Sequence, residues 1–173
     1  MQPATVESAV AVRDIPVRPL TRETFAPFGD LIAPMEDGVP FGQSDAALDL
    51  THGTPRLYIM RLPPKGLVFR QITRHRSVTQ CLAAMGGHAW FIAVAPPIGL
   101  DDPAAEPALR DIAAFRVPGD VALKLHRGTW HAGPFFEDRE ISFLNLELSD
   151  TNEVDHQNSR LAERFGFALR FAV

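Results

Sequence analysis

The sequence predicts an all-β fold, a jelly-roll β-barrel with a few short helices. Fifteen prolines and twelve glycines are spread over 173 residues, which favours short strands joined by turns over long helices. Roughly eight or more short runs are apolar throughout or alternate between apolar and polar residues. That many strands in a small chain close into a barrel or a double sheet, and a barrel can hold a ligand in its mouth.

The N-terminal third predicts a loose arm, an edge strand and one short helix. Residues 1–12 carry little signal. Ile15–Leu20 is expected at a sheet edge, because its two prolines have no N–H for a second neighbour. Thr21 can cap a helix over Arg22–Phe28. The polar stretch 34–53 is long for a loop in a compact domain, which makes it either functional or mobile.

The middle of the chain predicts buried strands. Arg56–Leu62 is interpreted as a buried strand that ends at two prolines, and Leu67–His75 as one alternating strand. After the Gly86-Gly87 turn signal, His88–Ala95 is the most continuously apolar segment.

The C-terminal half adds one strand with a mixed face. Glu140–Leu148 would place Ile141, Phe143, Asn145 and Glu147 on one side, facing either a cavity or solvent. The other expected elements are strands at Asp30–Ala33, Thr79–Met85, Asp111–Val117, Val121–His126 and Phe167–Phe171, and a helix at Ser159–Phe165 that ends at Gly166.

Composition restricts the kind of protein. With 46% hydrophobic residues, the 173 residues fit one domain with a real core. A net charge of −4 argues against nucleic acid as a partner, since phosphate binding needs a basic face. No apolar run approaches the roughly 20 residues of a membrane span. Cys81 is the only cysteine, and the N-terminus has no signal-peptide pattern, so we expect a cytoplasmic protein.

The segment Val121–Phe136 carries the most chemistry. An apolar strand leads into a turn with Gly128, Gly133 and Pro134, and the segment holds His126, Arg127, Trp130 and His131. This pattern indicates one wall of a small anion-binding pocket. The alternative is a structural turn with incidental histidines.

A second cluster lies earlier in the chain, where His75 stands between Arg74 and Arg76 and Gln80 follows. Imidazoles can act as acid or base near neutral pH or bind a transition metal, and guanidinium groups suit carboxylates. The alternative for any single histidine is an edge-of-core residue hydrogen-bonded to the backbone.

Several segments together resemble the ureidoglycolate lyase family of the cupin superfamily. They are LTRETFAPFGDLI, RHRSVTQCLAAMGG, HAWFIAVAPP, LHRGTWHAGPFF and FLNLEL. The resemblance implies a cupin barrel, often dimeric, and cleavage of ureidoglycolate into glyoxylate and urea during allantoin degradation in purine metabolism. It also implies a divalent metal, with nickel suggested. The segment Asp150–His156 differs from the better-known bacterial members.

The resemblance also assigns roles to residues. His75, Gln80 and His131 match the positions at which cupins hold a metal, with Gln80 in place of the usual carboxylate. We expect His75, His126 and His131 to be catalytic. We expect the substrate to be bound by Arg56, Arg74, Gln80, Arg127 and Trp130.

Two other functions stay open. A metal-dependent cupin oxygenase would need a carboxylate ligand such as Glu147 or Asp155, and a non-catalytic cupin would only bind a small carboxylate.

Overall fold

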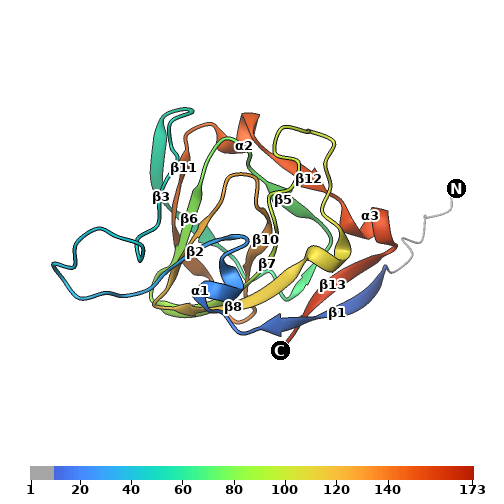
Figure 1. Cartoon of the computed structure of the whole chain (residues 1–173). Coiled ribbons are helices and arrows are strands. Elements are labelled where there is room, and N and C mark those ends of the chain that lie inside the picture. Colours follow the sequence, from blue (N-terminus) through green and yellow to red (C-terminus); the bar gives the residue numbers. More distant parts are fainter. Residues whose placement is uncertain (1–9) are drawn as a thin grey trace, which may run out of the picture.

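The computed structural model describes residues 10–173, in which short strands form two curled sheets around a common interior (Figure 1). In spatial order, the larger sheet contains β12 (Gln157–Ser159), β5 (Ile72–Arg74), β10 (Trp130–Phe135), β7 (Gly87–Ala95), β8 (Ala113–Gly119), β1 (Ala11–Arg18), β13 (Phe167–Ala172) and β4 (Val68–Phe69). The smaller sheet contains β2 (Gly29–Ile32), β9 (Ala122–Leu125), β6 (Gln80–Ala84), β11 (Ile141–Leu148) and β3 (Pro55–Leu62). The helical elements are α1 (Arg22–Phe25), α2 (Thr151–Val154), α3 (Leu161–Phe165) and the 3₁₀ turn η1 (Leu109–Asp111). The all-β prediction is confirmed.

Strand β7 separates two hydrophobic cores. Trp90, Ile92 and Val94 pack into the core that both sheets enclose, and Ala93 and Ala95 pack into a second core beneath β13 and α3. Successive side chains of a strand point to opposite faces, so a strand with a core on each side must be apolar at every position. This explains why His88–Ala95 is the most continuously apolar segment of the sequence.

Strand β1 corrects the expectation of an edge strand and of a loose arm reaching residue 12. Ala11–Pro16 pairs in parallel with β13, and Val17–Arg18 pairs with β8. The strand changes partner along its length, so each residue has a partner on one side only. Pro16 can therefore sit inside a sheet without losing a ladder hydrogen bond. Residues 1–9 lie outside the described residues.

Strand β3 corrects the expectation of a buried strand. It forms one edge of the smaller sheet and pairs with β11 over its whole length, from Pro55↔Leu148 to Leu62↔Ile141. One face turns inward, while Leu57 is 63% and Ile59 is 56% exposed on the outer face. An apolar strand was correctly predicted, but half of its apolar side chains lack cover within the described chain.

Strand β10 was not predicted, because Gly133 and Pro134 resembled a loop. The strand runs through both residues, and its pairing with β7 shifts register between Ala132 and Phe135. Conversely, the expected single strand Leu67–His75 is two short strands, β4 and β5. The expected first helix is also shorter, although Thr21 caps it as predicted.

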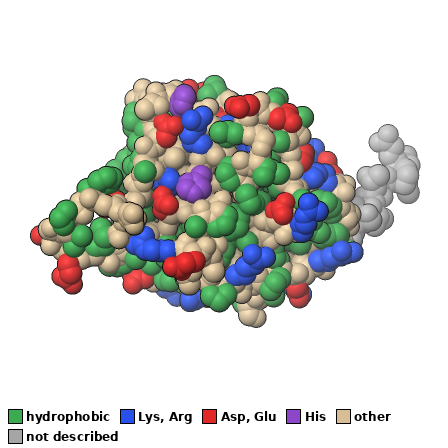
Figure 2. All heavy atoms as spheres, in the orientation of Figure 1, with side chains coloured by type: hydrophobic (Ala, Val, Ile, Leu, Met, Phe, Trp, Pro, Cys, Tyr) green, Lys and Arg blue, Asp and Glu red, His purple; other side chains and the backbone are tan. Residues whose placement is uncertain are grey.

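The segment between β2 and β3 has no regular secondary structure and projects from the body of the molecule (Figure 1). It carries exposed hydrophobic side chains, seen as green spheres on the projecting arm in Figure 2, and Phe41 is 85% exposed. No helix within residues 10–173 is long and apolar enough to cross a membrane.

Candidate active site

A cavity of about 280 Å³ lies between the two sheets, where the hydrophobic core gives way to polar side chains. Its walls come from β3, β5, β6, β10 and β11, with further residues from α2 and the loop before β4. The inward face of β11 changes along its length: Ile141 and Phe143 belong to the core, whereas Asn145 and Glu147 line the cavity. The mixed face expected for Glu140–Leu148 therefore points inward.

His75 and His131 lie together in this cavity, as their positions in the sequence predicted. Their ring centroids are 5.2 Å apart. The Nδ1 atom of His75 is 2.5 Å from the backbone oxygen of Asp155, and Nδ1 of His131 is 3.3 Å from that of Thr129. A carbonyl oxygen can only accept, so in each neutral ring Nδ1 carries the hydrogen and Nε2 keeps its lone pair.

Both histidines favour the neutral form. Burial lowers the pKa of His131 to about 3, and the neighbouring His75 contributes. Burial also lowers the pKa of His75, although the carbonyl and carboxylate of Asp155 oppose this effect. The site therefore holds two uncharged imidazoles with available lone pairs.

A third histidine joins this pair. The ring of His156 lies 5.4 Å from that of His75, nearly edge to face, and His156 also lines the cavity. It lies in the divergent segment Asp150–His156, to which the sequence assigned no role. The only sequence signal was the adjacent Asp155, a carboxylate that could pair with the imidazole, whereas in the structure the backbone oxygen of Asp155 contacts His75.

Gln80 lines the cavity with the histidines and belongs to a buried polar network. Its Nε2 donates to Glu147 Oε2 at 2.9 Å and to Asn145 Oδ1 at 3.2 Å. Tyr58 joins through its hydroxyl group, which donates to Glu147 Oε1 at 3.1 Å and accepts from Asn145 Nδ2 at 3.0 Å. Gln80 Oε1 is buried and has no hydrogen-bond partner among the described residues.

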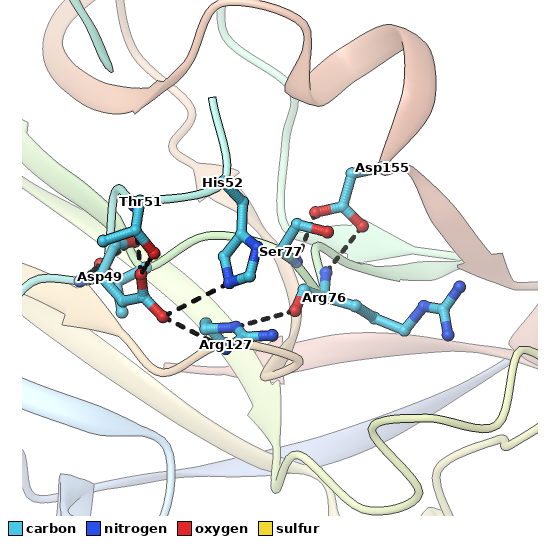
Figure 3. A network of polar contacts seen from close by, with 8 residues as sticks. Asp49, Thr51, His52, Arg76, Ser77, Arg127 and Asp155 are labelled. Carbon is cyan, nitrogen blue, oxygen red and sulfur yellow. Dashed lines mark hydrogen bonds and ion pairs between the residues drawn. The ribbon is translucent and has the colours of Figure 1, made fainter. Parts of the chain in front are cut away.

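The residues between His75 and Gln80 are held from two sides (Figure 3). The carboxylate of Asp155 accepts from the backbone N–H groups of Arg76 and Ser77, at 2.8 and 2.7 Å. From the other side, the backbone N–H of Asp49 donates to the Thr79 hydroxyl at 2.8 Å, and the backbone N–H of Thr79 donates to the Asp49 backbone oxygen at 3.2 Å. Both ends of this short connection are fixed, which sets where the His75 and Gln80 side chains enter the cavity.

Arg127 also holds the connection between His75 and Gln80. It does not line the cavity, which corrects its expected place in the pocket wall. Its Nε donates to the backbone oxygen of Arg76 at 3.0 Å, and its NH1 donates to Asp49 Oδ2 at 3.1 Å (Figure 3). The pKa of Asp49 is lowered, chiefly by hydrogen bonds from Thr51, so this carboxylate stays ionised beside the guanidinium. The long loop before β3 thus supports the site through its C-terminal end.

Arg74 and Trp130 lie on the opposite side of their strands, which corrects their expected contact with substrate. Arg74 is fully buried, donates to the backbone oxygens of Ile98, Gly99 and Asp102, and stacks over Trp130 at 4.7 Å. Thr73 and His131, the strand neighbours of these residues, are the ones that face the cavity. Alternation along β5 and at the start of β10 turns the members of each of these two pairs to opposite faces.

Arg56 and His126 are also absent from the cavity wall. Arg56 stacks on the ring of Tyr58 at 3.8 Å and supports the wall from outside. His126 contacts the backbone oxygen of Ala26 and the ammonium group of Lys124, which is paired with Asp30. Its two nitrogens are therefore engaged outside the main cavity, although its ring borders a small recess that His75, Gln80 and His131 also line.

Lys65 is the one Lys or Arg side chain among the cavity-lining residues of the described chain. It lies in the loop after β3, where its backbone N–H donates to the oxygen of Phe136. Partial desolvation at the cavity wall lowers the pKa of its ammonium group. Sequence reasoning missed Lys65, because it favoured the arginines near the histidines.

The side chains do not form the ligand set of a usual metal site. Within residues 10–173, no group of three or more His, Cys, Asp or Glu side chains is arranged to hold a metal ion. His75, His131 and Gln80 supply two imidazoles and an amide, whereas cupin-like metal sites use a carboxylate in addition to histidines. The two carboxylates considered for this role are engaged, Glu147 with Gln80 and Asp155 with backbone amides.

The buried neutral histidines predict that stability decreases in acid. The pKa of His131 is about 3 in the folded protein and near 6.5 when unfolded, so the unfolded chain binds the proton more readily. The free energy of unfolding should be highest above pH 6.5 and fall by up to ~1.4 kcal/mol per pH unit for this group as the pH decreases toward 3. Urea denaturation between pH 7.5 and about 4.5 measures this, and H131Q should show a smaller decrease. Equal pH dependence in both proteins would contradict the assignment.

Comparison with known proteins agrees with the geometry. The family model described as ureidoglycolate lyase matches residues 12–166. A ureidoglycolate lyase from Stutzerimonas stutzeri is 27% identical over 159 residues, covering 80% of this chain and 85% of the relative. One from Escherichia coli is 27% identical over 150 residues, covering 80% and 90%. The chain therefore belongs to the ureidoglycolate lyase family.

Proposed function

We propose that this enzyme cleaves ureidoglycolate into glyoxylate and urea at the cavity between the two sheets. Family membership supports the reaction class. The observation that carries the proposal is His75, a cavity-lining imidazole whose Nδ1–H is held by the Asp155 backbone oxygen while Nε2 keeps its lone pair. A base oriented by a second group is the arrangement that proton transfer requires.

The reaction is an elimination and needs no water. In ureidoglycolate one carbon carries a hydroxyl, a carboxylate and a ureido nitrogen. His75 Nε2 takes the hydroxyl proton, the C–O bond becomes a carbonyl as the C–N bond breaks, and the imidazolium returns the proton to the departing nitrogen. Glyoxylate and urea then contain all atoms of the substrate. His131, with its low pKa, remains neutral and accepts a hydrogen bond.

Lys65 binds the substrate carboxylate in this proposal. An anion in a partly enclosed cavity needs a cation or several donors, and Lys65 is the cation in the wall. Gln80, beside the histidines, binds the ureido group. The arginines expected for these roles hold the surrounding structure instead.

Neither alternative function has a specific observation in its favour. No step is assigned to a metal ion, and a bound divalent metal, with nickel suggested, stays a prediction of the family resemblance that metal analysis of the purified protein can check. The role in allantoin degradation and the cytoplasmic location also stay predictions.

H75A should lower kcat by roughly a hundredfold or more, the usual scale for a lost acid or base. The assay is release of glyoxylate and urea from racemic ureidoglycolate. H126A should lower kcat far less, because His126 contacts Ala26 and Lys124 outside the cavity. Wild-type protein that binds the substrate without releasing products would favour the non-catalytic alternative. Equal losses in the two variants would contradict the role of His75.

K65M should raise KM roughly 10- to 100-fold, the scale of a lost charge-assisted hydrogen bond, with a smaller effect on kcat. K65R should retain most of the affinity, because it keeps the positive charge. R61M is the matched control, because Arg61 is exposed and pairs with Glu140 outside the cavity. An unchanged KM in K65M would mean that the substrate carboxylate does not bind at Lys65.

We also propose that two copies associate through the outer face of the smaller sheet. Leu57 and Ile59 of β3 lie opposite Leu146 and Leu144 of β11, which makes two exposed or half-exposed apolar cross-strand pairs. Strand β3 is an open edge, and the arm with Phe41 projects from the same side of the molecule (Figure 1). A second copy would cover an edge and an apolar face that water solvates poorly.

Light scattering at micromolar concentration should return the mass of a dimer. I59E should shift the mass toward that of a monomer, because it places a charge in the middle of the proposed interface. V154E, on exposed α2, is the control and should remain dimeric. A monomer mass for the wild-type protein would refute the dimer.

A further inference from the structure

Glu147 is a buried carboxylate whose hydrogen-bond donors are all neutral. It is 1% exposed and accepts from Gln80 Nε2 at 2.9 Å, from the Tyr58 hydroxyl at 3.1 Å and from Asn152 Nδ2 at 3.2 Å. Burying a charged carboxylate costs several kcal/mol unless hydrogen bonds compensate, and a neutral side chain could fill this space more cheaply. The charge therefore calls for an explanation beyond packing.

The consequence of that charge is an unambiguous orientation for Gln80. An amide side chain can normally present either its oxygen or its NH2 group to a neighbour. A carboxylate can only accept, so Glu147 requires the NH2 group of Gln80 to face it. The second contact agrees, because the same Nε2 donates to Asn145 Oδ1 while Asn145 Nδ2 donates to the Tyr58 oxygen.

This orientation leaves an unpaired acceptor on a side chain that lines the cavity together with His75. Gln80 Oε1 is turned away from Glu147, is buried and has no partner among the described residues. Gln80, His75 and His131 line the main cavity together, and behind it the same three residues and His126 border a recess too small for a water molecule. Because Nδ1 of both histidines is engaged with a backbone oxygen, their Nε2 lone pairs are further acceptors among the residues that line the cavity with Gln80.

We propose that Glu147 is a positioning residue that fixes Gln80 Oε1 as an acceptor and so makes the site specific for a ligand with an N–H donor at this point. The identity of that donor as the ureido N–H of the substrate rests on the proposed function. The orientation of Gln80 itself does not depend on it. Tyr58 and Asn145 hold the two ends of the same network and prevent the amide from turning over.

Two unreactive ligands test this specificity by calorimetry. Ureidoacetate keeps the inner N–H but lacks the hydroxyl group, so it cannot be cleaved by the proposed route. Carbamoyloxyacetate replaces that N–H by an oxygen atom and is otherwise matched in size and charge. Wild-type protein should bind ureidoacetate at least roughly tenfold more tightly than carbamoyloxyacetate. The oxygen atom that replaces the N–H cannot donate to Gln80 Oε1, so two acceptors would face each other in a buried place.

E147Q should lose most of this preference and also lower kcat. The new amide can donate to Gln80, which then turns its NH2 group toward the ligand. The double variant Q80E/E147Q should recover the preference, because the carboxylate now at position 80 accepts from the amide at position 147 with one oxygen and presents the other to the ligand. The ratio of the two affinities is the readout, since a removed or relocated carboxylate charge affects the two equally charged analogues alike. E153Q, an exposed change on α2, is the control and should keep the wild-type ratio.

The outcomes separate the inference from the function. Thermal melting first confirms that each variant is folded. If E147Q is folded and keeps the wild-type preference, or if the double variant fails to restore it, the positioning role is wrong. If wild-type protein binds neither analogue, or binds both equally, the specificity is wrong. If the preference behaves as expected but ureidoglycolate is not cleaved, the lyase proposal fails and the role of Glu147 stands.

Discussion

The alternation of side chains along the strands is the constraint on which the whole structure depends. In β7 it directs alternate side chains into two hydrophobic cores, and in β11 it places Phe143, Asn145 and Glu147 in one inward row. The same rule separates neighbours. Thr73 faces the cavity while Arg74 is buried behind it, and His131 faces the cavity while Trp130 packs in the second core. The site exists where the inward row changes from apolar to polar.

The residues around the cavity divide into those that touch it and those that hold it. Asp155, Asp49 and Arg127 fix the connection between His75 and Gln80 through backbone groups, from three segments far apart in sequence. Asp155 has two functions, since its carboxylate holds Arg76 and Ser77 while its backbone oxygen orients His75. This is the structural role of the segment Asp150–His156, which the sequence alone left unexplained.

The electrostatics of the cavity agree with the proposed ligand, which has a neutral N–H donor and a single negative charge. Burial keeps His131 uncharged, the Glu147 charge is used on neutral hydrogen-bond donors, and Lys65 carries the positive charge at the wall. The observed set suits a small molecule whose carboxylate and N–H groups lie on different sides of one carbon.

Turn residues and alternation are local signals, so the sequence was sufficient to predict the all-β class, most strands and the cap at Thr21. Through motif resemblance it also predicted that His75 and His131 lie together. It also located Gln80 in the site. Tertiary structure alone decided that β1 lies inside a sheet, that β3 is an edge, and that Gly133 and Pro134 belong to a strand. It also decided which cations reach the cavity. Arg74 and Arg127 are close to the histidines in sequence, but they donate to carbonyl and carboxylate groups outside the cavity. Lys65 lies in the loop after β3, and its side chain lines the cavity. The physical reason is that a guanidinium group is placed by acceptors supplied from other segments, and a single sequence does not encode which segments those are in any local pattern.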